Sequence, residues 1–182
     1  MARRPGRAKK GPQQPPDHAL GRSRGGWGSR IHVVTDGEGT SLSVHVSAGQ
    51  VHESSVSEQM VTAVRIRQPP GRPRRLAGEK ACDLARIRRW LRRRSIGVVI
   101  PPRHQPHGGK PGRPPPLDGQ AYRPRNAIER CIGWLKHARR IATRFQKAAV
   151  HFLAMLEIAT IQHYFKTYSR GTPYATSMGP RR

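Results

Sequence analysis

The stretch 122–136 places one acid among bases at spacings that could support phosphodiester chemistry. Its candidate residues are Tyr122, Arg125, Glu129 and Lys136. On a helix that turns about 100° per residue, Arg125, Glu129 and Lys136 project within roughly 40° of one another. A carboxylate beside cations, in a very basic chain, is suited to holding a divalent metal ion against a phosphate. The pattern therefore indicates metal-assisted phosphodiester chemistry.

The same stretch also has an ordinary structural interpretation. Asn126, followed three residues later by Glu129, resembles a capping box at a helix start. Arg125 and Glu129 could equally form a surface ion pair worth a few tenths of a kcal/mol. Spacing alone favours this interpretation over catalysis. The apolar stripe that such a helix would bury consists of Ile128, Ile132 and Leu135.

The composition points to a polyanionic partner. The 182 residues suffice for one domain or part of one, and they hold 35 Lys plus Arg against 10 Asp plus Glu, a net charge of +25. Nucleic acid is favoured over a membrane, because no apolar run approaches the ~20 residues that span a bilayer. Cys82 and Cys131 are isolated, which argues against a zinc site or a disulfide framework. We expect a cytoplasmic, nucleoid-associated protein.

The first half of the chain predicts a hairpin followed by a helix. Segments 30–35 and 42–46 alternate apolar and polar residues around the turn sequence 36–39. Ser55 and Glu58 form a capping box that predicts a helix start. This order, strands first and a helix next, begins an α/β domain.

The middle of the chain predicts two strands joined by a basic helix. The strands are 76–80, which ends near Glu79, and 97–100, and Asp83 is expected to cap the helix between them. Its apolar stripe is Leu84, Ile87, Trp90 and Leu91. Its other face carries Arg86, Arg88, Arg89, Arg92, Arg93 and Arg94. Six arginines without compensating acids indicate phosphate contacts, and we take Arg89 and Arg93 as DNA-binding residues.

The second half predicts a mobile loop and a long apolar helix. Residues 103–121 are rich in Pro, Gly and His without periodicity, which predicts the loop. A break at 141–147 precedes the helix 148–165, whose thin polar face predicts that it is buried or docks a partner.

Three histidines could belong to a site. His52 lies beside acids, although a hydrogen bond within its own turn is the favoured interpretation. His104 and His107 could imitate a metal-binding pair, but no third ligand lies near them in the sequence. We therefore assign none of them to a site.

Taken together, the motifs resemble one family. Tyr-x2-Arg-x3-Glu-x6-Lys, at Tyr122, Arg125, Glu129 and Lys136, is similar to the signature of the DDE transposases of bacterial insertion sequences, of the family 5 or family 4 type. The segments 21–26 (Gly-Arg-Ser-Arg-Gly-Gly) and 49–54 (Gly-Gln-Val-His-Glu-Ser) resemble the same family in the same order. The resemblance covers roughly residues 19–165.

The resemblance implies a fold and a chemistry. It implies an RNase H-like α/β domain, a mixed sheet flanked by helices, here with an additional C-terminal helix. Three carboxylates of that fold hold Mg²⁺ or Mn²⁺ for DNA cleavage and strand transfer. Glu129 would be the last of these metal-binding catalytic acids and Glu79 the second. Tyr122, Arg125 and Lys136, with Arg22 and Arg24, would contact DNA or support Glu129. DNA is the implied partner, acted on by a homo-oligomer when the protein is complete.

The chain departs from the family pattern at two acids. Glu79 stands where the family usually has Asp, and the extra methylene moves the carboxylate by about 1.5 Å. Cys82 stands where a Tyr is usual. The first acid is not identified, because Asp17 lacks a strand pattern and Asp36 is explained by its turn.

These departures predict a partial catalytic domain. The expected organisation is a disordered or extended basic arm at 1–28, a domain at 29–168 that lacks its first, central strand, and a disordered tail at 169–182. Such a chain would be the C-terminal part of a split or truncated transposase. It would be inactive and marginally stable alone. Two origins fit: a second reading frame that is joined to the product of an upstream frame, or a decayed remnant. The rival interpretation is a non-catalytic basic nucleic-acid-binding protein in which Glu79 and Glu129 are ordinary surface acids.

Overall fold

The computed structural model of the chain describes residues 16–64, 73–103 and 116–169. Residues 1–15 of the predicted arm, most of the predicted loop and tail, and His104 and His107 lie outside these residues. The described part is an α/β protein with two small sheets that share no hydrogen-bonded strand. A single RNase H-like sheet therefore stays a prediction, while the α/β class is confirmed.

The larger sheet contains the predicted hairpin. It is antiparallel, with the order β1 (Gly21–Ser23), β2 (Gly26–Thr35) and β3 (Ser41–Ala48). Ile31 lies opposite Val46 and Val33 opposite Val44, so one face of the sheet is apolar. The carboxylate of Asp36 closes the turn by accepting hydrogen bonds from three backbone N–H groups at 2.8–2.9 Å. This confirms a turn role for Asp36.

The smaller sheet pairs β4 (Arg75–Ala77) and β5 (Gly97–Val99) in parallel. A 3₁₀ turn, η2 (Lys80–Cys82), and helix α2 (Ala85–Arg93) connect the strands. The buried cluster under α2 consists of Ile87, Leu91, Ile96 and Ile100. The predicted strand 76–80 was too long, because β4 ends at Ala77 and the chain turns into η2. Glu79 thus lies just after the strand.

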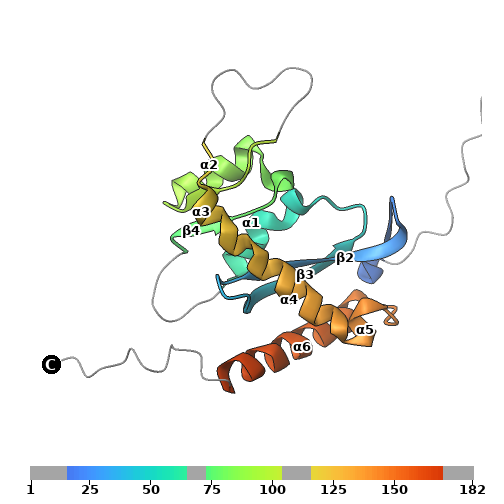
Figure 1. Ribbon diagram of the computed structural model, residues 1–182. Coiled ribbons are helices and arrows are strands. Elements are labelled where there is room, and N and C mark those ends of the chain that lie inside the picture. Colours follow the sequence, from blue (N-terminus) through green and yellow to red (C-terminus); the bar gives the residue numbers. More distant parts are fainter. Residues whose placement is uncertain (1–15, 65–72, 104–115, 170–182) are drawn as a thin grey trace, which may run out of the picture.

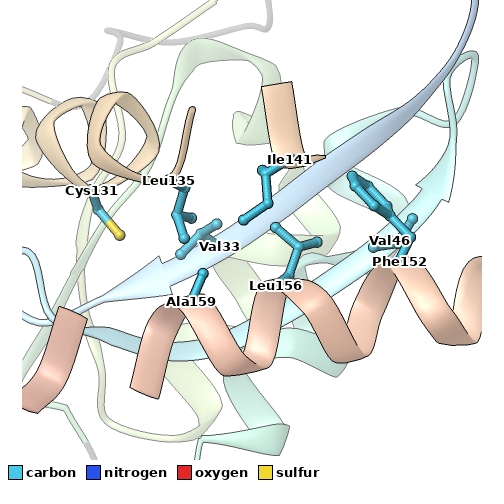
Figure 2. Packing of buried hydrophobic residues seen from close by; sticks show 8 residues of the cluster. All are labelled: Val33, Val46, Cys131, Leu135, Ile141, Phe152, Leu156 and Ala159. Atoms are coloured by element: carbon cyan, nitrogen blue, oxygen red, sulfur yellow. The ribbon is translucent and has the colours of Figure 1, made fainter. Parts of the chain in front are cut away.

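Three helices cover the apolar face of the larger sheet. They are α4 (Asn126–His137), α5 (Arg139–Ala142) and α6 (Ala149–Ser169). Figure 2 shows their side chains converging on the sheet to form the main core, which comprises Val33, Val46, Cys131, Leu135, Ile141, Phe152, Leu156 and Ala159. The buried part of α6 confirms the predicted packing helix. Its other side exposes large apolar residues, namely Val150, Ile158, Ile161, Tyr164 and Phe165.

Helix α1 (Glu53–Ala63) joins the two halves of the molecule. It contacts β2 and β3 as well as η2 and α2. In Figure 1, α6 lies on one side of the larger sheet and α1 and α2 lie on the other, while α4 runs diagonally from the region of β4 to α6. The N-terminal end of α4 is thereby placed beside the smaller sheet.

Several predicted helix starts were wrong. Helix α1 begins at Glu53 rather than at Ser55, and the His52 side chain caps it by accepting from Ser54 N. Leu84, not Asp83, is the N-cap of α2. The predicted capping box at Asn126 does not form, because α3 (Gly119–Tyr122) and a 3₁₀ turn, η3 (Arg123–Arg125), lead directly into α4. Asn126 has helical backbone angles. Helix α3 also shortens the predicted loop, and α5 extends into the predicted break.

The end of the predicted arm belongs to the larger sheet. A short 3₁₀ turn, η1 (Pro16–His18), precedes β1, whose residues pair with Gly26, Trp27 and Gly28 of β2. Residues 21–28 therefore form a hairpin continuous with the sheet rather than a separate arm. None of the helices in the described ranges is both long and apolar enough to span a membrane.

Candidate active site and nucleic-acid interface

Two predicted catalytic acids meet where β4 ends and α4 begins. Arg125 Nη1 lies 3.0 Å from Glu79 Oε1 and 3.2 Å from Glu129 Oε1. Glu79 occupies the N-cap position of η2, and Glu129 lies in the first turn of α4. A single guanidinium thus joins carboxylates from two distant segments of the chain. The ion pair between Arg125 and Glu129 was anticipated from the sequence, whereas the link between Arg125 and Glu79 was not.

This acid–base triad is open to solvent. The side chains of Glu79 and Glu129 are 54% and 53% exposed, and that of Arg125 is 24% exposed. Water screens such pairs, so each contributes about 0–1 kcal/mol. The triad positions charge at the surface and contributes little to the free energy of folding.

Neighbouring contacts hold the triad in place. Asp118 caps α3 by accepting from Ala121 N at 3.0 Å, and its other oxygen lies 3.7 Å from Arg75 Nη1 on β4. The Tyr122 ring centroid lies 5.6 Å from Cζ of Arg125, a cation–π contact. Tyr122 therefore contacts Arg125, while its role in DNA binding or in support of Glu129 stays a prediction.

A buried ion pair anchors η2, the turn that carries Glu79. Asp83 Oδ1 accepts from Arg88 Nε at 2.6 Å, and Asp83 Oδ2 accepts from Arg103 N at 2.6 Å. Arg88 Nη2 also donates to the Ile100 carbonyl at 2.7 Å. Arg88 therefore does not belong to the predicted phosphate-binding face. Sequence reasoning missed this pair, since an Arg within a run of arginines gives no local sign that it is buried.

The remaining predicted DNA-binding arginines lie on two other elements, α2 and the β1–β2 hairpin. Arg89 and Arg93 are exposed on α2, whereas Arg86 pairs with Glu58 at 2.6 Å. Arg22 and Arg24 are exposed on the β1–β2 hairpin. In Figure 1 that hairpin lies on the opposite side of the molecule from α3. The structure thus presents exposed cations on at least two separate surfaces.

Lys136, the last residue of the signature, does not join the triad. It is exposed near the C-terminal end of α4, about 10 Å along the axis from Glu129. A DNA contact of Lys136 stays a prediction.

The described residues do not contain a complete metal site. They include no cluster of three or more His, Cys, Asp or Glu side chains able to hold a metal ion. His52 bonds within its own turn, with Nδ1 2.7 Å from Ser54 Oγ, as favoured from the sequence. Burial, aided by the nearby Glu53 and Glu79 charges, raises the pKa of Cys82 to about 11, so its thiol is protonated at neutral pH.

Comparison with known proteins agrees with the signature. Residues 8–162 match the family model described as the transposase DDE domain. The chain belongs to the DDE transposase family. It is 35% identical over 153 residues to a putative transposase for insertion sequence element IS402 from Burkholderia cepacia. That match covers 81% of this chain and 64% of the relative, so the chain spans about two thirds of the relative's length. No solved structure matches the chain.

Proposed function

We propose that this DDE transposase chain is the catalytic portion of an insertion-sequence transposase that cuts and joins DNA with a divalent metal ion. The observation that carries the proposal is the convergence of Glu79 and Glu129 on one surface site. The charge of +25 supports DNA as the substrate. We expect the complete protein to bind this DNA as a homo-oligomer.

The carboxylates of Glu79 and Glu129 could supply some of the ligands of one divalent metal ion. Carboxylate oxygens suit Mg²⁺ or Mn²⁺, and Mg²⁺ is commonly held by one or two carboxylates together with phosphate oxygens. Glu79 and Glu129 would hold such an ion, which would polarise a phosphodiester and activate an attacking oxygen. A site for two ions needs a further acid that the described residues do not bring to this place.

Arg125 is the cation that pairs with both acids in this structure. Because its two ion pairs are solvent-exposed, a divalent cation can displace it at small cost. The released guanidinium and the Tyr122 hydroxyl would then be available to phosphate oxygens. Lys136, Arg89, Arg93, Arg22 and Arg24 would hold other phosphates of the DNA.

The open edges of the sheets support an RNase H-like arrangement with an additional central strand. From Ser29 to Thr35, β2 pairs with β3 on one side, and β4 pairs with β5 among the described strands. A strand inserted between β2 and β4 would join the sheets and satisfy both edges. We expect this strand, with the first acid, to come from the product of an upstream reading frame, and the 182-residue chain to be inactive alone.

The decisive experiment measures nicking and strand transfer on DNA that carries the element's ends, with Mg²⁺ or Mn²⁺. The chain is assayed alone and fused to the upstream frame, with Glu129→Gln as the inactive control and Glu79→Asp as the family-like variant. The proposal requires cutting by the fusion and loss of cutting in Glu129→Gln. If neither form cuts but both bind DNA with a steep dependence on salt, the chain is a non-catalytic nucleic-acid-binding protein.

Exchange of Arg125 for a metal ion has a separate test. Arg125→Ala removes the competing cation, so we expect the fusion to bind Mn²⁺ about 3- to 10-fold more tightly by calorimetry, the equivalent of two weak ion pairs. Arg125→Lys, which keeps the charge, serves as the matched control. Weaker Mn²⁺ binding in Arg125→Ala would show that Arg125 orients the acids instead of competing for them.

A further inference from the structure

The hairpin of β1 and the start of β2 presents an exposed aromatic ring between arginines. Trp27 is 69% exposed and lies directly opposite Arg22 in the strand register. Directly opposed residues share one face of a strand pair, with their Cβ atoms about 5 Å apart. Arg24 follows in the turn and is also exposed. The ring and two cations thus stand together at one tip of the molecule.

The base of this hairpin packs closely against the backbone at Gly49. Gly49 N donates to the Gly28 carbonyl at 3.0 Å, and a Cβ at Gly49 would lie 2.9 Å from the carbonyl oxygens of both Gly21 and Gly28. Ser23 Oγ donates to the Gly26 carbonyl at 3.1 Å and closes the turn. Trp27 therefore projects from a fixed platform.

The surroundings of Trp27 favour a nucleic acid over a protein partner. No acid occurs between residues 18 and 35. The other strongly exposed apolar side chains gather mainly on α6, whereas Trp27 is the one large apolar residue exposed on this hairpin. A single ring among cations is too small for a stable apolar interface, but it matches one nucleobase with its flanking phosphates.

We propose that Trp27 stacks on an unpaired base of DNA while Arg22 and Arg24 bind the phosphates beside it. The inference rests on the proposed function in that DNA is the substrate. The inference adds a binding residue, Trp27, and a ligand, a base outside the duplex stack. The proposed chemistry at the acid triad requires neither of them. Such stacking is sequence-tolerant, because every base has a π-face.

The test uses the full chain and a duplex with one unpaired 2-aminopurine, compared with the same duplex fully paired. We expect quenching of both Trp27 and 2-aminopurine fluorescence, and preference for the unpaired probe. Trp27→Ala should weaken binding to the unpaired probe by about 5- to 150-fold and leave the paired duplex nearly unchanged. Trp27→Phe, which keeps a ring, should retain most of the preference.

Three further measurements distinguish the possible failures. Arg22→Ala should weaken binding to both probes and flatten the salt dependence, whereas Arg22→Lys should not. Emission from Trp90 and Trp134 reports whether each variant is folded. Equal affinity of the wild type and Trp27→Ala for the unpaired probe would overturn the inference and leave the proposed function intact. Loss of self-association in Trp27→Ala without a change in DNA binding would assign the ring to a second copy and also overturn it. Absence of any DNA binding by the wild type would refute both proposals.

Discussion

Removing Arg88 should destabilise the chain more than removing any other arginine of α2. The side chains of Arg88 and Asp83 are 10% and 7% exposed, and they are joined at 2.6 Å. Arg88→Ala leaves a buried carboxylate with one charged partner gone and leaves the Ile100 carbonyl without its donor. Breaking a buried pair in this way costs about 3–5 kcal/mol. That is a large fraction of the 5–15 kcal/mol typical of a whole domain.

The assay is urea unfolding of the 182-residue chain and its variants, followed by circular dichroism. With a slope of about 1–3 kcal/mol per molar, the midpoint for Arg88→Ala should fall by about 1–5 M. Arg89→Ala is the matched control, because Arg89 is the exposed neighbour on the same helix, and it should change the free energy of unfolding by less than about 0.5 kcal/mol.

A third variant separates the charge from the packing. The double change Asp83→Leu with Arg88→Met removes both charges and keeps the volume, so it should recover much of the loss from Arg88→Ala. If Arg88→Ala costs less than about 1 kcal/mol, or equals Arg89→Ala, then Arg88 is not a buried partner of Asp83 and the reasoning fails. In the fused protein, Arg88→Ala should also lower DNA cleavage, because the Asp83–Arg88 pair anchors η2, the turn that carries Glu79.

Three other predictions follow from buried groups. Burial, together with the nearby His45 and Arg30 charges, lowers the pKa of His32 to about 4. As the pH falls, His32 is therefore protonated in the unfolded chain before it is protonated in the folded one, and the free energy of unfolding should fall by about 2–3 kcal/mol between pH 6.5 and pH 4. Urea melts at each pH should show this loss in the wild type and not in His32→Gln. Leu156→Ala should cost about 2–5 kcal/mol and Ile158→Ala almost nothing, since Leu156 is 0% and Ile158 52% exposed; equal costs would contradict the packing of α6. With its pKa near 11, about one Cys82 thiol in a thousand is ionised at pH 8, so alkylation should be far slower than for a free cysteine, and rapid labelling would refute this environment.

Local patterns in the sequence predicted the elements whose signals are themselves local. The alternation around Asp36 predicted the β2–β3 hairpin, and the apolar run after residue 148 predicted α6. The signature predicted that Arg125 and Glu129 lie on one helical face, and their ion pair is present. These features depend on residues a few positions apart, which periodicity and turn chemistry describe well.

Contacts between distant segments were beyond such reasoning. Nothing near Glu79 in the sequence indicates that Arg125, 46 residues later, will pair with it. The burial of Arg88 depends on Ile100 and Arg103, which approach only when β5 aligns with β4. The capping box at Asn126 failed for a local reason, because α3 and η3 lead directly into α4 and Asn126 already has helical backbone angles.

The composition of the main core has a consequence for how the chain folds as it is made. Val33 and Val46 pack against side chains from α4, α5 and α6, of which Phe152, Leu156 and Ala159 come last from the ribosome. At about 5–20 residues per second, on the order of 5–20 s separate the synthesis of the hairpin from that of α6. Until α6 is made, α4 and α5 can cover the apolar face of the hairpin only in part, so nascent chains are most exposed to aggregation and to chaperones before residue 150. A stop codon ahead of α6 would therefore leave a sheet that cannot bury its core, even though the acid triad would already have been translated.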